Sequence, residues 1–367
     1  MSTNQNKYQK SSYFMRLALQ QATKSLGNTR KNPAVGCVIV KNNHLISAGY
    51  TSIGGRPHAE QNAINFSEIN PQNSELYVTL EPCSHYGKTP PCVKSIIKSK
   101  IKKVFFSIND PDPRSFNKSA TTLRSGAVGV SSNILKDEIK FFYKSYFKSK
   151  KSNLPFVTCK LAISKDFYTI NKKNKLITNS SSRGRVHLMR SSHECVITSS
   201  KTVIKDNPRL TCRINGLNYS SPSRIILDNK LKTNINSKIV KEANKYRTII
   251  FYNKINKIKI ISLKKLKIRT YKIPLDNNGN LDLKASLIKA KEIGFSRIFL
   301  ETGAILTTSF FNKKLIDDFK LFISSKKLGN NGNGSIKKYF HTFLKNKKKI
   351  VEKVNLSGDK LISYKIK

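Results

Sequence analysis

The 367-residue sequence contains no tryptophan, and its acidic residues are scarce: 21 Asp and Glu stand against 69 Lys and Arg, giving a formal net charge of +48. Long apolar runs are also missing, since no stretch approaches the roughly 18 apolar residues of a membrane span. The first ten residues are polar and lack the apolar segment of a secretory signal. We therefore predict a soluble, cytoplasmic protein that has no membrane partner.

Cysteine is sparse as well, with six residues in the whole chain. Six are too few for a disulfide scaffold of this length and suit a reducing compartment. Hydrophobic residues make up 38% of the chain, with 19 Phe and 14 Tyr, which excludes a fully disordered protein. At about 100–200 residues per domain, the length predicts two domains or one large one.

The excess of positive charge is mostly lysine, with 55 Lys against 14 Arg. One interpretation is a polyanionic partner, because clustered cations attract phosphates and release counterions. However, runs such as Lys347-Lys348-Lys349 are short and scattered, and Arg, the better reader of bases and phosphates, is rare. General lysine enrichment is therefore favoured, and we predict no specific nucleic-acid partner.

The first 150 residues alternate between helical and strand-like patterns. A helix is expected to end near Gly27, and the strand Val35–Val40 turns at Asn42-Asn43 into a hairpin partner. Further predicted elements are a helix from His58, a strand at Leu76–Leu80, a helix opened by Pro90-Pro91 and a strand at Val104–Ile108. This alternation predicts a layered α/β/α domain.

A long helix is predicted over Ile134–Phe147, and the polar run Lys148–Asn153 marks a domain boundary, giving domains 1–149 and 150–367. Gly329–Gly334 is expected to be a flexible surface loop. Beyond the boundary, strand-like and helical patterns alternate again, which predicts a second, mostly parallel α/β domain. Its predicted strands are Phe156–Ile163, Cys195–Thr198, Arg224–Asp228, Thr248–Tyr252, Arg297–Glu301 and Phe319–Ser324, and its helices lie around Val186–Met189, Leu281–Ile293 and Ile305–Leu315.

Four residues of the first domain have the types and order of a catalytic zinc site. His58, Cys83 and Cys92 supply one imidazole and two thiolates, which leaves the fourth tetrahedral position for water. Zinc would lower the pKa of that water, and Glu60, two residues from His58, would transfer its proton. Each residue alone is more often a core residue, but this His-x-Glu and Pro-Cys…Cys order is that of the zinc-dependent deaminases. We predict one Zn²⁺ per chain.

The spacing of the two cysteines narrows the class of deaminase. Nucleic-acid and cytidine deaminases usually have two residues between them, whereas eight intervene here. So long a loop, held at both ends by one metal, can present His85, Lys88 and Thr89 to a substrate. Taken alone, Lys88 fits better as a solvated lysine of a lysine-rich protein.

Three segments together resemble the bifunctional riboflavin-biosynthesis deaminase/reductase family: Asn32–Val40, Gly55–Glu60 and Thr79–Cys92. The resemblance covers nearly the whole chain. It implies a cytidine-deaminase-like first domain with zinc ligands His58, Cys83 and Cys92 and the proton shuttle Glu60. It further implies that Asn32, together with the loop residues His85, Lys88 and Thr89, binds the pyrimidine substrate.

The second domain lacks a G-x-G-x-x-G fingerprint, so its residues alone do not indicate a dinucleotide site. The resemblance implies a dihydrofolate-reductase-like α/β domain that uses NADPH to reduce a ribosyl chain. Gly303, between a predicted strand and helix, would also offer backbone N–H groups to a phosphate on physical grounds. The implied cofactor residues are Ala162, Leu176, Thr202, Asp206, Asn229 and Gly303, and the implied substrate residues are Lys160, Asn174, Arg190, Leu210, Arg213 and Glu301. Without the resemblance, Arg190 and Arg213 fit as surface residues and Glu301 as a helix cap.

The sequence departs from the family pattern in both halves. Ser115–Ser119 stands where the family has a glycine-containing stretch, and Phe167 follows Asp166 in place of glycine. Asn174 replaces a substrate-binding serine, and Leu176 replaces the tryptophan that packs on the cofactor. The missing aromatic surface would cost on the order of 1 kcal/mol of stacking, so weaker NADPH binding is expected.

The leading hypothesis is therefore a two-step enzyme that deaminates a phosphoribosyl-aminopyrimidine and then reduces its ribose. One alternative is an active deaminase whose reductase half has decayed. A nucleic-acid deaminase and a basic RNA-binding protein on an inactive deaminase scaffold are further alternatives. The sequence does not determine the oligomeric state, and both a monomer and a homo-oligomer are compatible with it.

Overall fold

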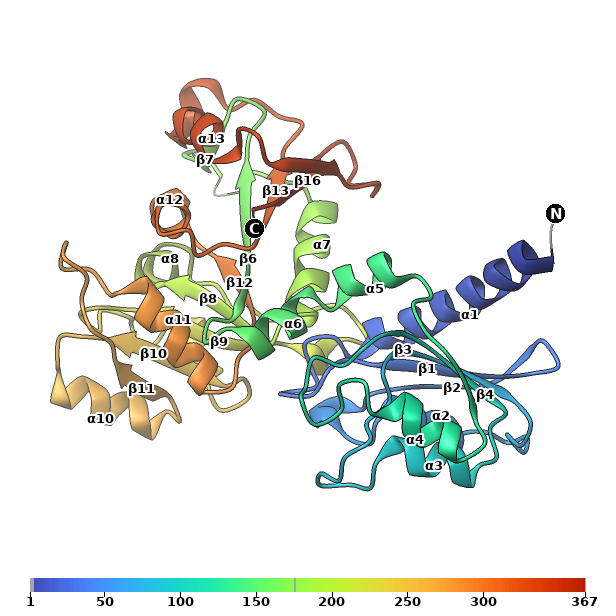
Figure 1. Cartoon of the computed structure of the whole chain (residues 1–367). Helices are drawn as coiled ribbons and strands as arrows, with labels where there is room; N and C mark the ends of the chain where they lie inside the picture. Colours follow the sequence, from blue (N-terminus) through green and yellow to red (C-terminus); the bar gives the residue numbers. More distant parts are fainter. Residues whose placement is uncertain (1–2, 175, 367) are drawn as a thin grey trace. The chain divides into compact units, whose positions relative to one another are not determined.

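The computed structural model describes residues 3–174 and 176–366, and the chain divides into two compact units. The first unit extends to Ser152 and the second begins at Asn153. Figure 1 shows the first in blue to green and the second in green to red. Among the described residues, no helix is both long enough and apolar enough to cross a membrane.

The first unit contains a five-stranded sheet in the order β2-β1-β3-β4-β5. Its strands are β1 (Gly36–Lys41), β2 (His44–Tyr50), β3 (Glu75–Leu80), β4 (Lys103–Ile108) and β5 (Gly129–Ser131). Strand β1 pairs antiparallel with β2 and β3, whereas β3, β4 and β5 run parallel. The predicted hairpin and both later strands are therefore confirmed.

Helices cover both faces of this sheet, as the α/β/α prediction requires. They are α1 (Thr3–Ser25), α2 (Ala59–Asn65), α3 (Cys92–Lys98), α4 (Ser119–Ser125), α5 (Lys136–Phe142) and α6 (Lys144–Lys151). Helices α1 and α5 lie on one face and α2, α3 and α4 on the other (Figure 1). At Gly36 a Cβ atom would lie 1.9 Å from the Ala18 carbonyl oxygen of α1, so glycine permits this close packing.

The single helix predicted over Ile134–Phe147 is wrong in its extent. Leu135 has a left-handed backbone (φ 53°), and the chain leaves helical geometry again at Tyr143, so α5 and α6 are separate. The buried Tyr143 hydroxyl lies 2.6 Å from the Thr79 hydroxyl and donates to the Ala34 carbonyl, which fixes the bend against the sheet. Helix α6 also extends through most of the polar run that marks the predicted domain boundary.

The second unit contains a nine-stranded sheet in the order β11-β10-β9-β8-β12-β6-β13-β16-β15. The strands from β11 to β13 are parallel and β16 and β15 are antiparallel, so the mostly parallel sheet is confirmed. The nine strands are β6 (Phe156–Ile163), β8 (Cys195–Ser199), β9 (Ser223–Leu227), β10 (Thr248–Tyr252), β11 (Arg269–Lys272), β12 (Arg297–Glu301), β13 (Asp318–Ile323), β15 (Lys348–Val351) and β16 (Lys360–Lys365). A separate two-stranded sheet is formed by β7 (Tyr168–Asn171) and β14 (Gly332–Ser335).

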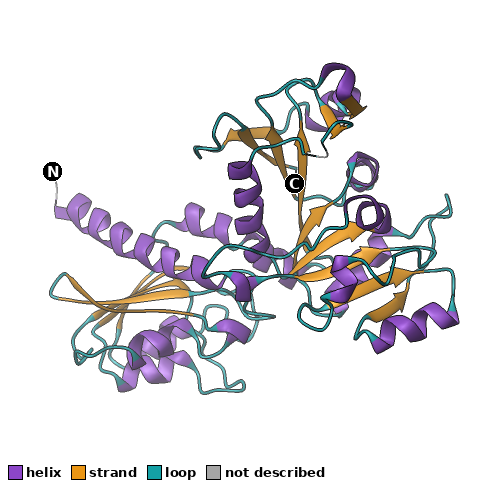
Figure 2. Ribbon diagram, turned by 180° about the vertical axis from the view of Figure 1, so that it is seen from behind, coloured by secondary structure: helices purple, strands orange, loops and turns teal. Residues whose placement is uncertain are grey.

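The helices of this unit also pack on both faces, and Figure 2 shows them on either side of the strands. They are α7 (Ser180–Ser191), α8 (Ser200–Asp206), α9 (Lys238–Lys241), α10 (Lys257–Lys265), α11 (Leu283–Glu292), α12 (Ala304–Asn312) and α13 (Lys337–Leu344). Residues of α11 and α12 join one buried apolar cluster, and residues of α7 to α10 join the cluster on the opposite face. The sheet therefore lies between two apolar clusters, one on each face, at the centre of the unit.

The expected Gly329–Gly334 loop is instead partly ordered. Strand β14 pairs antiparallel with β7, and a Cβ atom at Gly332 would lie 2.2 Å from a Tyr168 ring carbon. The absence of a side chain therefore lets this strand lie directly against the tyrosine ring. The glycine- and asparagine-rich composition of this segment indicated a loop, because a strand held only by backbone hydrogen bonds needs no apolar side chains and so shows no apolar pattern.

Candidate active sites

The predicted zinc ligands meet where two short helices of the first unit begin. His58 is the N-cap residue of α2, and Cys92 is the first residue of α3, directly after Pro91. Cys83 lies in the loop that leaves β3. Proline suits the residue before the first helical turn because the backbone N–H groups there have no helical acceptor.

The geometry of these three side chains fits a tetrahedral zinc ion. His58 Nδ1 lies 3.5 Å from Cys83 Sγ and 3.4 Å from Cys92 Sγ. Zinc bonds of about 2.3 Å to sulfur and 2.0 Å to nitrogen place two tetrahedral ligand atoms about 3.5 Å apart. The Cys92 backbone N–H also donates to Cys83 Sγ over 3.3 Å, and hydrogen bonds from Cys92 and His58 lower the pKa of the Cys83 thiol. The donor set therefore matches zinc in type and spacing.

Glu60 lies on the first turn of α2, beside these sulfur atoms, and is 3% exposed. Burial, followed by the charge of Cys83, raises the pKa of its carboxyl to about 7. A carboxyl group with this pKa can both accept and release a proton near neutral pH. This is the property that the predicted proton shuttle requires.

Asn32 is held close to the segment that leads into His58. Its side-chain amide donates to the Gly55 carbonyl oxygen over 2.8 Å. The amide orientation is therefore set by the same turn that positions the histidine. Its contact with a pyrimidine stays a prediction.

The long loop between the two cysteines is tied to its surroundings through side chains. His85 Nδ1 lies 2.8 Å from the Ser115 hydroxyl, and Arg56 donates to the Thr89 hydroxyl. Lys88 is exposed. Ser115 belongs to the segment that departs from the family pattern, so this segment supports the loop that carries His85. Sequence reasoning missed both Ser115 and Arg56.

Glu81 is a further residue that sequence reasoning missed. It is 3% exposed and directly precedes Pro82 and Cys83. One carboxylate oxygen accepts the backbone N–H groups of Asp110 and Asn117, and the other accepts the N–H and hydroxyl of Ser119. Glu81 thus joins the Cys83 loop to the segment that carries Ser115. An acidic residue directly after a buried apolar strand was the signal that would have indicated it.

In the second unit, predicted cofactor residues gather at one edge of the sheet. Thr202, Asn229 and Gly303 follow the carboxyl ends of β8, β9 and β12, which are parallel strands of one sheet. Ala162 and Lys160 lie near the carboxyl end of β6. Ligands of open α/β sheets bind at this edge.

Two features of this edge fit a phosphorylated nucleotide. Gly303 is the N-cap of the nine-residue helix α12, and a Cβ atom added to it would meet nothing within 4 Å. The helix N-terminus therefore offers open space and unpaired N–H groups to a phosphate. In addition, the buried Oδ1 atom of Asn229 has no hydrogen-bond partner among the described residues.

Arg190 and Glu301 form a nearly buried ion pair on the α7 side of the sheet. Two guanidinium nitrogens of Arg190 donate to the two Glu301 oxygens over 2.6 and 3.0 Å, and a third donates to the Thr211 carbonyl over 3.0 Å. Burial opposes ionisation of Glu301, but the charge and hydrogen bonds of Arg190 lower its pKa below the ordinary value. Lys160, opposite Glu301 in the strand register, has its pKa lowered by burial. The interpretation of Glu301 as a helix cap is therefore wrong.

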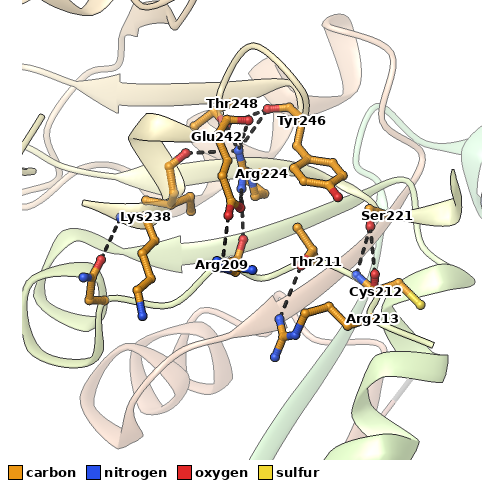
Figure 3. A network of polar contacts seen from close by, with 12 residues as sticks. Arg209, Thr211, Cys212, Arg213, Ser221, Arg224, Lys238, Glu242, Tyr246 and Thr248 are labelled. Carbon is orange, nitrogen blue, oxygen red and sulfur yellow. Dashed lines mark hydrogen bonds and ion pairs between the residues drawn. The ribbon is translucent and has the colours of Figure 1, made fainter. Parts of the chain in front are cut away.

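The segment from Arg209 to Arg213 is held by buried donors. Arg224 is fully buried and donates to the Arg209 carbonyl over 3.0 Å, and the Arg213 side chain donates to the Thr211 hydroxyl over 3.3 Å (Figure 3). Leu210 is 4% exposed and packs in the apolar cluster on the α7 side of the sheet. Its side chain is therefore a core group, and a contact with substrate through it is not supported.

Three other predicted residues lie apart from these contacts. Asn174 and Leu176 are exposed in the loop after β7, and Asp206 is exposed at the end of α8. Phe167 has the left-handed backbone (φ 70°) that explains the family's glycine, and its partly buried ring packs on the core. The packing of this ring offsets part of the roughly 1–2 kcal/mol that such a backbone costs.

Comparison with known proteins finds a family model for each of the two units. The model of the cytidine and deoxycytidylate deaminase zinc-binding region matches residues 8–108, and that of the RibD C-terminal domain matches residues 155–355. The chain belongs to the RibD family. The riboflavin biosynthesis protein RibD of Aquifex aeolicus is 34% identical over 357 residues, covering 96% of this chain and 97% of its own length. The resemblance and the fold class predicted from sequence are thus confirmed.

Solved RibD structures share the whole architecture. Acinetobacter baumannii RibD (form 1) has a TM-score of 0.83 and 28% identity, covering 98% of this chain and 99% of its own. A Thermotoga maritima diaminohydroxyphosphoribosylaminopyrimidine deaminase/5-amino-6-(5-phosphoribosylamino)uracil reductase has a TM-score of 0.81 and 27% identity, with the same coverage. Because these matches span both units, they favour a bifunctional RibD enzyme over a nucleic-acid deaminase or a binding protein.

Proposed function

We propose that this chain catalyses two successive steps of riboflavin biosynthesis. The first is zinc-dependent deamination of 2,5-diamino-6-(5-phosphoribosylamino)pyrimidin-4-one to 5-amino-6-(5-phosphoribosylamino)uracil. The second is NADPH-dependent reduction of the ribosyl chain to ribityl. The observation that carries the proposal is the placement of His58 Nδ1 at 3.4 and 3.5 Å from two cysteine sulfurs, beside the buried Glu60.

In the first reaction His58, Cys83 and Cys92 would hold one Zn²⁺, which when bound would lower the pKa of a water molecule toward neutrality. Glu60 would accept one proton from the attacking water and pass it to the ring nitrogen, while the water oxygen bonds to the amino-bearing ring carbon. The second proton of that water would pass through Glu60 to the amino group. Asn32, His85, Lys88 and Thr89 bind the substrate around the pyrimidine. The carbon–nitrogen bond to the amino group breaks, and ammonia leaves.

In the second reaction NADPH, when bound, supplies the hydride. Gly303 and the first turn of α12 hold a phosphate of the cofactor, and Asn229 and Thr202 lie along the same sheet edge. Lys160 and Glu301 face the sugar, with Arg190 and Arg213 binding the substrate. Ala162 lies beside the cofactor, and the exposed Asp206 contacts it from the end of α8. The exposed Asn174 and Leu176 contribute less than the family residues that they replace.

We assign the deaminase to residues 1–149 and the reductase to residues 150–367. The substrate is a small phosphorylated pyrimidine, and no nucleic acid is required. All six cysteines are free thiols, which supports a location in the reducing cytoplasm.

One assay tests both steps. Zinc-loaded protein is incubated with the diaminopyrimidine ribotide, with and without NADPH, and ammonia and NADPH absorbance are followed. Ammonia release that is lost on chelation and restored by zinc is expected, and NADPH oxidation should depend on prior deamination. Undiminished ammonia release from metal-free protein would overturn the deaminase, and unchanged NADPH with the deaminated substrate would overturn the reductase.

A further inference from the structure

His187 is a partly buried residue of α7 that lies three positions before Arg190, so both side chains occupy the same face of the helix. The Arg213 backbone N–H donates to His187 Nδ1 over 3.0 Å, while Arg190 donates to the Thr211 carbonyl. Two side chains on one face of α7 therefore bind the backbone of the segment 209–213, at Thr211 and at Arg213.

A third point of the same segment is fixed from the other side, where the buried Arg224 binds the Arg209 carbonyl (Figure 3). The groups held are at positions 209, 211 and 213. Cys212 is also bound, through its N–H and carbonyl, to the Ser221 hydroxyl, so the backbone that carries the Arg213 side chain has little freedom to move. The His187 contact is the last of the three and lies directly at Arg213.

The charges around Arg213 show why such fixing is needed. Burial, followed by the charges of Arg190 and Arg209, lowers the pKa of Arg213, so these guanidinium groups repel one another. Arg213 is exposed and its guanidinium donates to the Thr211 hydroxyl over 3.3 Å, so the position of its backbone decides whether the side chain stays next to Thr211, which Arg190 also binds. Burial and the charges of Arg190 and Arg213 also lower the pKa of His187 to about 4, so the ring is neutral near pH 7 and its Nδ1 can accept.

We propose that His187 is a positioning residue for the reductase reaction: its Nδ1 binds the Arg213 backbone N–H and keeps the Arg213 guanidinium beside Arg190, where both meet the phosphorylated substrate. This inference rests on the proposed function, in which Arg190 and Arg213 bind substrate. It assigns His187 no contact with substrate or cofactor. Its loss should therefore weaken substrate binding and leave hydride transfer almost unchanged.

The test compares two substitutions of similar shape. His187→Asn retains an acceptor close to the position of Nδ1, whereas His187→Leu removes it. We expect His187→Leu to raise the reductase KM for the deaminated ribotide about tenfold, near the upper end of the effect of one lost hydrogen bond, with kcat changed less than about threefold. His187→Asn should restore KM to within about threefold of the wild type. Leu188→Ala, at a more exposed position of the same helix, serves as the matched control.

Three further readouts keep the result interpretable. The KM for NADPH and the thermal midpoint identify a variant whose second unit has misfolded, and ammonia release reports on the first unit. Equal losses in the Asn and Leu variants, or an unchanged KM in His187→Leu, would overturn the role of His187. Absence of NADPH oxidation by the wild-type protein would instead contradict the proposed function itself.

Discussion

The two units assemble their candidate sites in different ways. In the first, the metal-binding atoms and the proton carrier all come from the stretch between His58 and Cys92, and the ligand atoms lie within 4.8 Å of one another. In the second, the corresponding groups lie at or near the carboxyl ends of four strands between Lys160 and Gly303, and several are exposed.

The difference reflects the chemistry of the ligands. A zinc ion accepts only a few side-chain types at fixed distances, so the first site depends on particular residues. A nucleotide phosphate is bound mainly by backbone N–H groups at a helix start, so the second site depends on how the sheet edge is built. Substitutions of single acidic residues in each unit test this comparison.

The largest effect is expected for Glu60→Gln in the first unit. The amide cannot carry the proton, so kcat for ammonia release should fall about 10²- to 10⁴-fold. Zinc content and NADPH oxidation with the deaminated substrate should remain at wild-type values. Metal analysis and the two activity assays on one preparation measure all three, and deamination within threefold of the wild type would remove Glu60 from the mechanism.

Next is Glu301→Gln in the second unit, where stability and activity change together. The substitution leaves the Arg190 charge nearly buried and without its ionic partner, which should cost about 3–5 kcal/mol of unfolding free energy. Reduction should be lost while ammonia release continues. Denaturant unfolding of the second unit, followed together with both activities, checks these expectations.

A double substitution separates the two consequences. Replacing the pair by apolar residues of similar size, Arg190→Met with Glu301→Leu, should recover most of the stability because no charge remains buried. Reduction should stay absent, since the side chains proposed to bind substrate are gone. Recovery of activity along with stability would show that the pair serves the fold alone.

The comparison also explains what the sequence could predict. His58, Cys83 and Cys92 were identifiable because metal chemistry restricts the residue types, and the structure brings them together. The role of Glu81 was harder to predict, because the only signal is an acidic residue after a buried strand. Its partners, backbone N–H groups and a serine hydroxyl, lie 29 to 38 residues later. The roles of the reductase residues stay predictions, since they depended on the family resemblance.

Secondary structure shows the same limit. Strands β6, β10 and β12 were predicted at their observed ends because buried parallel strands are continuous apolar runs. The break at Tyr143 was missed because apolar spacing continues across it into Tyr146 and Phe147. Strand β14, formed by glycine and polar residues, lacks any such pattern. Sequence thus predicts elements that bury side chains better than elements held by backbone contacts.

Glu194 provides a pH test in the second unit, away from the site. It lies at the amino ends of β8 and β12 and accepts the backbone N–H groups of Ser296 and Arg297. Burial raises the pKa of its carboxyl to about 7. Because the folded pKa lies above the unfolded one, the associated stability is complete below about pH 4 and is lost as the pH rises through 7.

The expected loss between about pH 5 and 7 is on the order of 2 kcal/mol of unfolding free energy. Glu194→Gln, neutral at every pH, should abolish this part of the dependence, whereas the exposed Glu292→Gln should keep it. Thermal unfolding across this range measures the difference. Identical slopes in Glu194→Gln and the wild type would show that Glu194 titrates normally in the folded protein.

The smallest effect is expected for Glu81→Gln, which tests how far the compact first site depends on residues beyond its ligands. Glutamine keeps one acceptor oxygen but has an NH₂ group in place of the other. The two hydrogen bonds that this second oxygen accepts from the 110–119 segment are therefore lost. Because supporting groups of this kind orient metal ligands, zinc affinity should fall about tenfold, the lower end of the range for such residues. Competition with a chelator measures this affinity, and the reductase of the same chain is the internal control. An unchanged zinc affinity with slower deamination would mean that Glu81 acts through Ser115 and His85 on the substrate loop and leaves Cys83 in place.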